Sequence, residues 1–327
     1  MIHQVTDHSF QTVSNSTYDM AFFASGYEKR CTHLAKLLHQ GKASQNTKIV
    51  EPIILGFLEL NHSEPRIVND RYFAKHWTDN QVNISADDEA PIYQLLSSIK
   101  PNRGRIKILV DYSSMSRLWY SGILNWARFS PYLEEIIIDL VYAVGSHKGS
   151  ALPMVIKDVV CIPGCEGGAA PIFRSVAVFG LGFEGLAALC VLDRLEPDEV
   201  YCYLASPAAF KDYPTKAQRI NRDIIKHSKA TLKLPLSSVE TSYTLLTELV
   251  APHRNEADVI FIPMGPKPHV LAAILMAMRF DGVACLRVSG KRSEPEQVEA
   301  TGELVVTRVR LKPPPCPSVV PHILSKP

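Results

Sequence analysis

The strongest constraint on the fold is the regular alternation of short apolar runs with helical patterns along most of the 327-residue chain. Short apolar runs rich in β-branched residues and bounded by turn residues are typical of buried strands. An apolar period of three to four residues in the segments between them is typical of helices that pack one face on a core. Strands that alternate with helices form β-α-β units, whose strands pair in parallel. The sequence therefore predicts an α/β protein built on parallel sheets.

The expected elements fall into two similar series. In the first half we expect strands at residues 18–24, 49–58, 106–110 and 135–144, and helices at 31–38, 87–99 and 117–128. In the second half we expect strands at 174–179, 199–204, 258–262 and 283–288, and helices at 184–195, 238–250 and 270–280. A β-rich run closes each half, at residues 155–162 and 304–311. Residues 67–85 show no clear period, and no element is assigned there.

The two halves also share short residue patterns at an offset of about 150 residues. Residues 25–28 match 181–184, residues 111–115 match 263–267, and residues 145–148 match 289–292. The alternative is the general likeness of any two β-α-β halves. Because the matches lie at strand ends, where loops are free to differ, they favour an internal duplication.

The duplication predicts two tandem Rossmann-like lobes, at residues 1–166 and 167–312, each ending in its own β-rich run. The turn-rich residues 163–168 would form the linker between them. Residues 313–327 hold six of the 23 prolines and predict an extended tail.

Composition excludes several classes of partner. The 35 Lys and Arg nearly balance the 33 Asp and Glu, whereas a protein that coats a long nucleic acid carries a large basic excess. The seven cysteines are scattered and odd in number, which is not a disulfide framework. The polar N-terminus has no apolar signal core, and glycines and Glu184 interrupt the longest apolar stretch, at 176–192. We expect a cytoplasmic protein with no membrane and no long nucleic acid among its partners.

In open parallel sheets, ligands bind beyond the carboxyl ends of the strands, where the strand order reverses. The sharpest pattern at such an end is Gly180-x-Gly182-x-x-Gly185, between a strand and a helix, an arrangement that can hold a phosphate at a helix N-terminus. No acidic residue ends the next strand to bind the ribose of NAD, so an NADP-like cofactor would have to use Ser206 and Lys211. A glycine turn that serves packing alone is the alternative.

The Gly-aromatic-Glu loops after the first strand of each half are the second candidate. Their glutamates could bind ribose hydroxyls, act as general acid or base, or simply lie favourably at a helix N-terminus. A carboxylate at a helix N-terminus is held ionised, which suits hydroxyl recognition better than proton donation. The candidate ligand-binding residues of these loops are Ser25, Gly26, Tyr27, Glu28, Gly182, Phe183 and Glu184.

Further polar loops follow later strands of both halves. Hydroxyls, backbone donors and an arginine at the start of a helix form a phosphate cradle, and cations recur at the equivalent ends of the other half. Solvated surface cations are the alternative, but the recurrence on one face favours an anionic ligand. The candidate ligand-binding residues here are Asp111, Ser113, Ser114, Arg117, Gly265, Lys267 and Ser289. The histidines are dispersed, and Cys161 and Cys165 lack a second ligand pair, so we expect no metal site.

Two Rossmann-like halves with polar loops at 25–28, 182–184 and 111–117 resemble the CRISPR-associated Rossmann-fold (CARF) sensors and the SAVED domains of antiphage signalling. The later family loop joins an Asp, a hydroxyl residue, glycines and a Lys or Arg before a Met. Here Asp111 to Arg117 is similar but lacks the glycines, and Pro263 stands at the Asp position of the second half. The resemblance implies that two halves face each other about a pseudo-two-fold axis. It also implies an oligonucleotide second messenger bound across the strand ends.

Three functions follow as hypotheses. The first is a module that recognises a nucleotide-like anion in the cleft between the lobes, in antiphage signalling. Because the two halves use up the chain, the effector activity would then lie on a separate protein partner, unless the protein acts on the ligand itself. The second is a nucleotide-processing enzyme, either an NADP-linked oxidoreductase or a hydrolase that uses Glu28 or Glu184. The third is a scaffold subunit of a larger complex.

Overall fold

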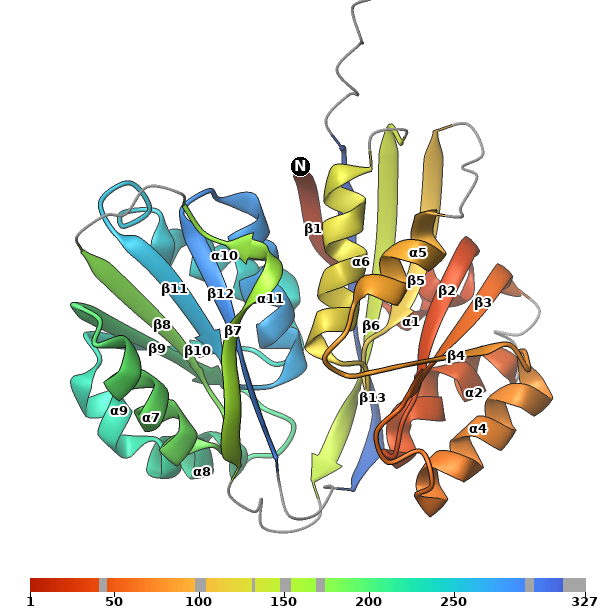
Figure 1. The fold of residues 1–327 in the computed structure, drawn as a ribbon, viewed down its shortest axis with the longest axis horizontal. Helices are drawn as coiled ribbons and strands as arrows, with labels where there is room; N and C mark the ends of the chain where they lie inside the picture. The colour runs from red at the N-terminus through yellow and green to blue at the C-terminus, as the bar shows by residue number, and fades with distance from the viewer. Residues whose placement is uncertain are drawn as a thin grey trace, which may run out of the picture.

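Two sheets of mostly parallel strands, one in each of two lobes, organise the protein (Figure 1). The computed structural model describes residues 1–40, 46–97, 104–130, 133–147, 154–168, 174–291 and 297–313. The predicted α/β class with two lobes is confirmed.

The first sheet has seven strands in the order β1-β13-β6-β5-β2-β3-β4. Its strands are β1 (Ile2–His8), β2 (Thr17–Ser25), β3 (Lys48–Phe57), β4 (Gln81–Ile84), β5 (Arg105–Asp111), β6 (Glu135–His147) and β13 (Val298–Leu311). The second sheet has six strands in the order β10-β9-β8-β11-β12-β7. Its strands are β7 (Val155–Glu166), β8 (Ser175–Leu181), β9 (Glu199–Ala205), β10 (Ala230–Leu234), β11 (Asp258–Pro263) and β12 (Val283–Lys291).

The five parallel strands of each sheet follow the same order. The series β4-β3-β2-β5-β6 of the first sheet corresponds to β10-β9-β8-β11-β12 of the second. In each series the order reverses once, between β2 and β5 and between β8 and β11, so each lobe has one switch point. The shared order is what a duplication predicts; the duplication itself stays a prediction.

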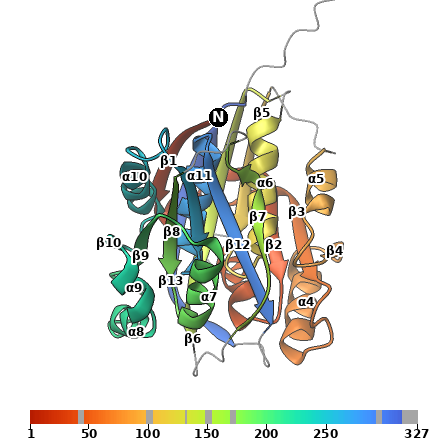
Figure 2. The same ribbon diagram turned by 60° about the vertical axis from the view of Figure 1, so that its left-hand side comes forward.

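Helices and sheets alternate in five layers (Figures 1 and 2). The helices are α1 (Phe10–Ser14), η1 (Lys29–Thr32), α2 (His33–His39), α4 (Glu64–His76), α5 (Ala90–Ser97), α6 (Arg117–Phe129), α7 (Gly185–Leu195), α8 (Tyr213–Ile220), α9 (Arg222–His227), α10 (Val239–Val250) and α11 (Lys267–Arg279). Helices α2 and α4 cover the outer face of the first sheet, and α7 and α9 that of the second. Helices α5, α6, α10 and α11 form the middle layer, where one continuous core joins the inner faces of both sheets.

The two β-rich runs lie in the opposite lobes from those that we expected. Strand β7 pairs antiparallel with β12 of the second sheet, and β13 pairs antiparallel with β6 of the first, with β1 on its other side. Each half of the sequence therefore supplies a strand to the sheet of the other half. The lobes consequently do not coincide with residues 1–166 and 167–312. Most of the predicted tail, residues 314–327, lies outside the described residues.

A buried ion pair fixes β13 on the first sheet. The guanidinium of Arg308 on β13 donates to both carboxylate oxygens of Asp139 on β6, at 2.7 and 2.8 Å. The hydroxyl of Tyr18 on β2 donates to the same carboxylate at 2.7 Å. Because the Asp139 side chain is only 1% exposed, these donors replace the water that it loses on folding.

Polar burial explains the elements that the sequence pattern missed. The unassigned residues 67–85 contain most of α4 and all of β4. The buried residues of α4 are Arg66, Asn69 and Phe73, so its inner face has no apolar stripe. The helix expected at 87–99 begins at Ala90 as α5, and residues 98 and 99 lie outside the described residues. No helix in the described residues is long and apolar enough to span a lipid bilayer.

Candidate functional site

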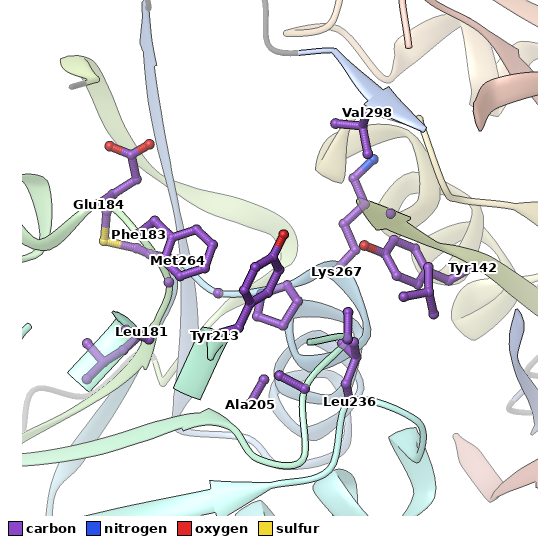
Figure 3. Close-up of a pocket in the computed structure, with 18 of the residues that line it drawn as sticks. Tyr142, Leu181, Phe183, Glu184, Ala205, Tyr213, Leu236, Met264, Lys267 and Val298 are labelled. Carbon is purple, nitrogen blue, oxygen red and sulfur yellow. The ribbon is translucent and has the colours of Figure 1, made fainter. Parts of the chain in front are cut away.

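A cavity of about 280 Å³ lies between the two lobes (Figure 3). The loops that follow β2 and β8 line it, together with the starts of α6 and α11, which follow β5 and β11. These are the strand ends at both switch points, so the places where each sheet would bind a ligand open onto one shared space.

The structure brings eight of the fourteen candidate residues to this cavity. They come from both lobes and from all four switch-point loops. They are Tyr27, Glu28, Arg117, Gly182, Phe183, Glu184, Gly265 and Lys267.

Five further candidates lie behind the cavity wall and hold its loops. Ser25 donates to Asp70 at 2.5 Å, and the carbonyl of Gly26 accepts from Asn69 at 2.9 Å. The remaining three, from the loop after β5, are Asp111, Ser113 and Ser114. All five are buried, so their direct neighbours are protein groups.

Ser289 does not belong to the site. We expected it in a loop after the last parallel strand, but β12 continues to residue 291. Ser289 is therefore a strand residue, paired in register with Asp158 of β7. The loop residues 148 and 292, which the sequence pattern also placed there, lie outside the described residues.

Sequence reasoning missed Arg30, which is central to the first-lobe side of the cavity. Its side chain is 4% exposed; the guanidinium donates to Glu28 at 2.7 Å and to the hydroxyl of Tyr142 at 2.9 Å. It also lies over the ring of Tyr142, 5.0 Å from the centroid. The one available signal was a cation two residues after Glu28, which resembles any solvated turn residue.

Glu28 is held as a carboxylate. Burial acts to raise its pKa, but the charges of Arg30 and Lys267 outweigh burial, and the net pKa of Glu28 is lowered. Ser114 donates a further hydrogen bond to it at 3.1 Å. A carboxylate with these partners is a poor proton donor at neutral pH.

Lys267 joins the lobes at the cavity. From the first turn of α11 its ammonium donates to the carbonyls of Ser113 and Met115, both at 2.8 Å, and of Tyr112 at 3.3 Å. Burial lowers the pKa of Lys267 to about 7, although Glu28 acts in the opposite direction. All three of its N–H groups are therefore engaged by the first lobe.

Asp111 is a buried acid at the end of β5. One carboxylate oxygen accepts from the backbone N–H and the hydroxyl of Ser113, and the other has no partner among the described residues. Burial raises its pKa to about 6, although the Ser113 hydrogen bonds and the charges of Arg30 and Lys267 act in the opposite direction.

Arg117 differs from the other two cations of the cavity. It begins α6, and among the described residues no carboxylate or other acceptor lies within hydrogen-bonding distance of its guanidinium. Its charge interacts across the lobe boundary with the second-lobe residues Tyr203, Cys285 and Arg287. Burial lowers its pKa, but arginine keeps its charge in proteins. The cavity thus contains a cation that the described protein groups do not neutralise.

The glycines of the Gly180-x-Gly182-x-x-Gly185 pattern are required for packing. A Cβ atom on Gly180 would lie 2.5 Å from the ring of Tyr203, and one on Gly182 would lie 2.6 Å from the carbonyl oxygen of Met264. A Cβ atom on Gly185 would meet the carbonyl oxygen of Ile220. The packing alternative therefore accounts for all three glycines without a bound dinucleotide.

Aromatic and small apolar side chains form the second-lobe wall. Phe183 meets Tyr213 edge-on at 5.3 Å between ring centroids, and Phe210 packs on the same tyrosine at 5.0 Å. Figure 3 shows Phe183 and Tyr213 on one side of the cavity and Lys267 with Tyr142 on the other. The sequence pattern did not single out the small apolar residues of this wall, which are Ala205, Ala208, Ala209 and Ala217.

The electrostatics of the cavity favour an anion. The guanidinium groups of Arg30 and Arg117 and the amine of Lys267, which is partly charged at neutral pH, face two lining carboxylates, Glu28 and Glu184. The N-termini of α6, α7 and α11 lie at the cavity, and each carries the positive end of a helix dipole. In the described residues no three His, Cys, Asp or Glu side chains gather in a way that could hold a metal ion.

The cavity is thus a partly apolar space between the two switch points, with an aromatic wall and with Arg117 as a cation that no described carboxylate neutralises. No protein-family model matches the chain, and no curated protein matches it in sequence.

Proposed function

We propose that the protein binds a small nucleotide-like anion in the cavity between its lobes. The observation that carries this proposal is Arg117, a partly buried cation on the cavity wall with no acceptor among the described residues. A buried charge without a partner is costly, and an anionic ligand would supply the missing partner. The convergence of helix N-termini and the aromatic wall support the same ligand class.

The role assigned to Lys267 changes from that in the sequence-based hypothesis. A cation at the start of α11 predicted a direct contact with the ligand. Since its ammonium already donates to three first-lobe carbonyls, Lys267 acts in the proposed site by joining the lobes. Arg117 is the cation that we assign to the ligand.

The finer statements implied by the family resemblance stay predictions. They are an oligonucleotide second messenger, a part in antiphage signalling, a separate effector partner and a cytoplasmic location. The ionised state of Glu28 favours recognition over proton transfer by that residue, which supports a binding function ahead of a hydrolase.

Calorimetric titration of the full chain with AMP, ADP, NADP and cyclic di-AMP tests the proposal. Arg117→Met should weaken binding by roughly 10- to 100-fold, as expected for a lost charge-assisted hydrogen bond. Arg105→Met is the matched control, because Arg105 begins β5, the strand that leads to Arg117, at the end away from the cavity, and its side chain is 72% exposed. Binding of none of the four compounds, or equal affinities for Arg117→Met and wild type, would reject the function.

A further inference from the structure

The two sides of the cavity are not equivalent, although the two sheets share one strand order. In an open parallel sheet a ligand lies beyond the carboxyl ends of the strands at the switch point, and the loop after the next strand outward can close over it. That outward strand is β3 in the first lobe and β9 in the second. A ligand with two similar ends would need both sides to be open.

On the first-lobe side the segment after β3 binds the loop after β2 and stays out of the cavity, which other first-lobe residues such as Tyr27 and Tyr142 line. Asn69 on α4 donates to the carbonyls of Gly26 at 2.9 Å and of Glu28 at 3.1 Å. Asp70, on the same helix, accepts from Ser25 and from the 2% exposed Arg66. No residue of the fully described segment 58–76, which follows β3, lines the cavity.

The second-lobe side has the same framework but stays open. Asn221 donates to the carbonyl of Gly182 at 2.8 Å, the counterpart of the bond from Asn69 to Gly26. The end of β9 and the segment after it nevertheless reach the cavity, through Ala205, Ala208 and Tyr213. With alanines in place of long polar side chains, this side keeps an apolar wall next to Phe183 and Tyr213.

The size of the cavity also suits one small ligand. Its volume of about 280 Å³ lies just below the lower end of the roughly 300–1,000 Å³ that is usual for pockets holding drug-sized ligands. Glu184, the counterpart of Glu28, accepts from the backbone N–H of Met154 at 3.3 Å. In Figure 3 its carboxylate lies at the opposite end of the cavity from Lys267.

We propose that the cavity holds a single mononucleotide, with its base on the aromatic second-lobe wall and its phosphate on Arg117, and not an oligonucleotide spread over both lobes. The inference rests on the proposed function and names the ligand class and its orientation. Arg117, at the start of α6 in the first lobe, and the rings of Phe183 and Tyr213 in the second lobe line the same cavity, so a phosphate position and a base position lie within one space. Any nucleobase can stack on an aromatic side chain, so this wall would accept a nucleobase of any identity.

The test compares the parts of the ligand on the full chain. AMP, adenosine, inorganic phosphate and cyclic di-AMP are titrated by calorimetry, and native mass spectrometry counts the bound AMP. We expect one AMP per chain, bound more tightly than any of the other three. Tyr213→Leu and Phe183→Leu should each weaken AMP by roughly 5- to 100-fold and leave phosphate unchanged.

Phe210→Leu is the matched control, because Phe210 packs on Tyr213 but does not line the cavity. Circular dichroism of each variant checks that it folds, and adenosine affinity of the unmodified chain tests the base site if a variant does not. Tighter binding of cyclic di-AMP than of AMP, or AMP affinity that depends on Arg117 but on neither ring, would overturn the mononucleotide orientation and leave the anion site standing. Failure of all four compounds to bind would remove the proposed function and this inference together.

Discussion

Asp111→Asn should make the protein more stable at neutral pH, although it changes a residue behind the cavity wall. Asp111 is 2% exposed, and one of its oxygens has no partner among the described residues. Burial raises its pKa from 3.8 to about 6, so the ionised form is disfavoured in the folded state by about 3 kcal/mol at pH 7. Asparagine removes the charge and keeps the oxygen that accepts from Ser113. Its buried amide NH2 group has no partner, which lowers the stability gained by about 1–3 kcal/mol.

The pH dependence gives the sharper result. Because the pKa of the folded state is raised, the folded protein binds more protons than the unfolded chain between about pH 4 and 6. The contribution of Asp111 to stability is therefore fully present below its unfolded pKa and is lost as the pH rises through about 6. From pH 4.5 to 7 the wild type should lose about 2 kcal/mol that the variant keeps.

Urea unfolding followed by tryptophan fluorescence at pH 4.5, 5.5 and 7 measures this difference. Groups that do not interact with Asp111 titrate alike in both proteins, so their effects cancel in the comparison. Lys267, whose pKa of about 7 the charge of Asp111 helps to raise, stays protonated at pH 4.5 and 5.5, so the difference between these two pH values is free of its titration. The reasoning is refuted if the stability difference between Asp111→Asn and wild type is the same at all three pH values.

Two further substitutions test the packing of the site and the strand pairing. Gly182→Ala places a Cβ atom 2.6 Å from the carbonyl oxygen of Met264, so thermal unfolding should show a loss of about 1–3 kcal/mol; an unchanged Tm would mean that the two loops are not in contact. Arg308→Met removes the two guanidinium hydrogen bonds of the 1% exposed Asp139 and leaves it with Lys107 at 3.7 Å, so urea unfolding should show a loss of about 1.5–3 kcal/mol; a loss below about 0.5 kcal/mol would contradict the placement of β13 beside β6.

The parts of the fold that depend on local interactions could be predicted from the sequence, and those that depend on long-range strand pairing could not. The β-α-β alternation depends on local patterns. The predicted strand at 135–144 lies within β6, and the one at 174–179 begins one residue before β8. The choice of partner for the two β-rich runs is not local. Both runs have the same strand pattern, and either could close either sheet, so the sequence alone could not show that they are exchanged.

The candidate site shows the same division. The switch-point rule located the loops that meet at the cavity, because the rule depends only on strand order. It could not show that Arg30 is buried, since the burial depends on Tyr142, which is distant in sequence. It misplaced Ser289 because an extended strand and a polar loop have similar residue content at that point. It also missed α4, whose inner face is polar.

The exchange of β7 and β13 has a consequence for how the protein is made. A ribosome delivers most of the first lobe first, yet in the described sheets β1 pairs only with β13, whose residues 298–311 are translated after all strands of the second sheet. The second sheet needs only residues 155–291 and can close before it. The lobe that is translated first is thus completed last, with the unpaired edge of β6 exposed until then. A ribosome that stops before residue 298 would release a chain whose second sheet is complete and whose first sheet lacks β13.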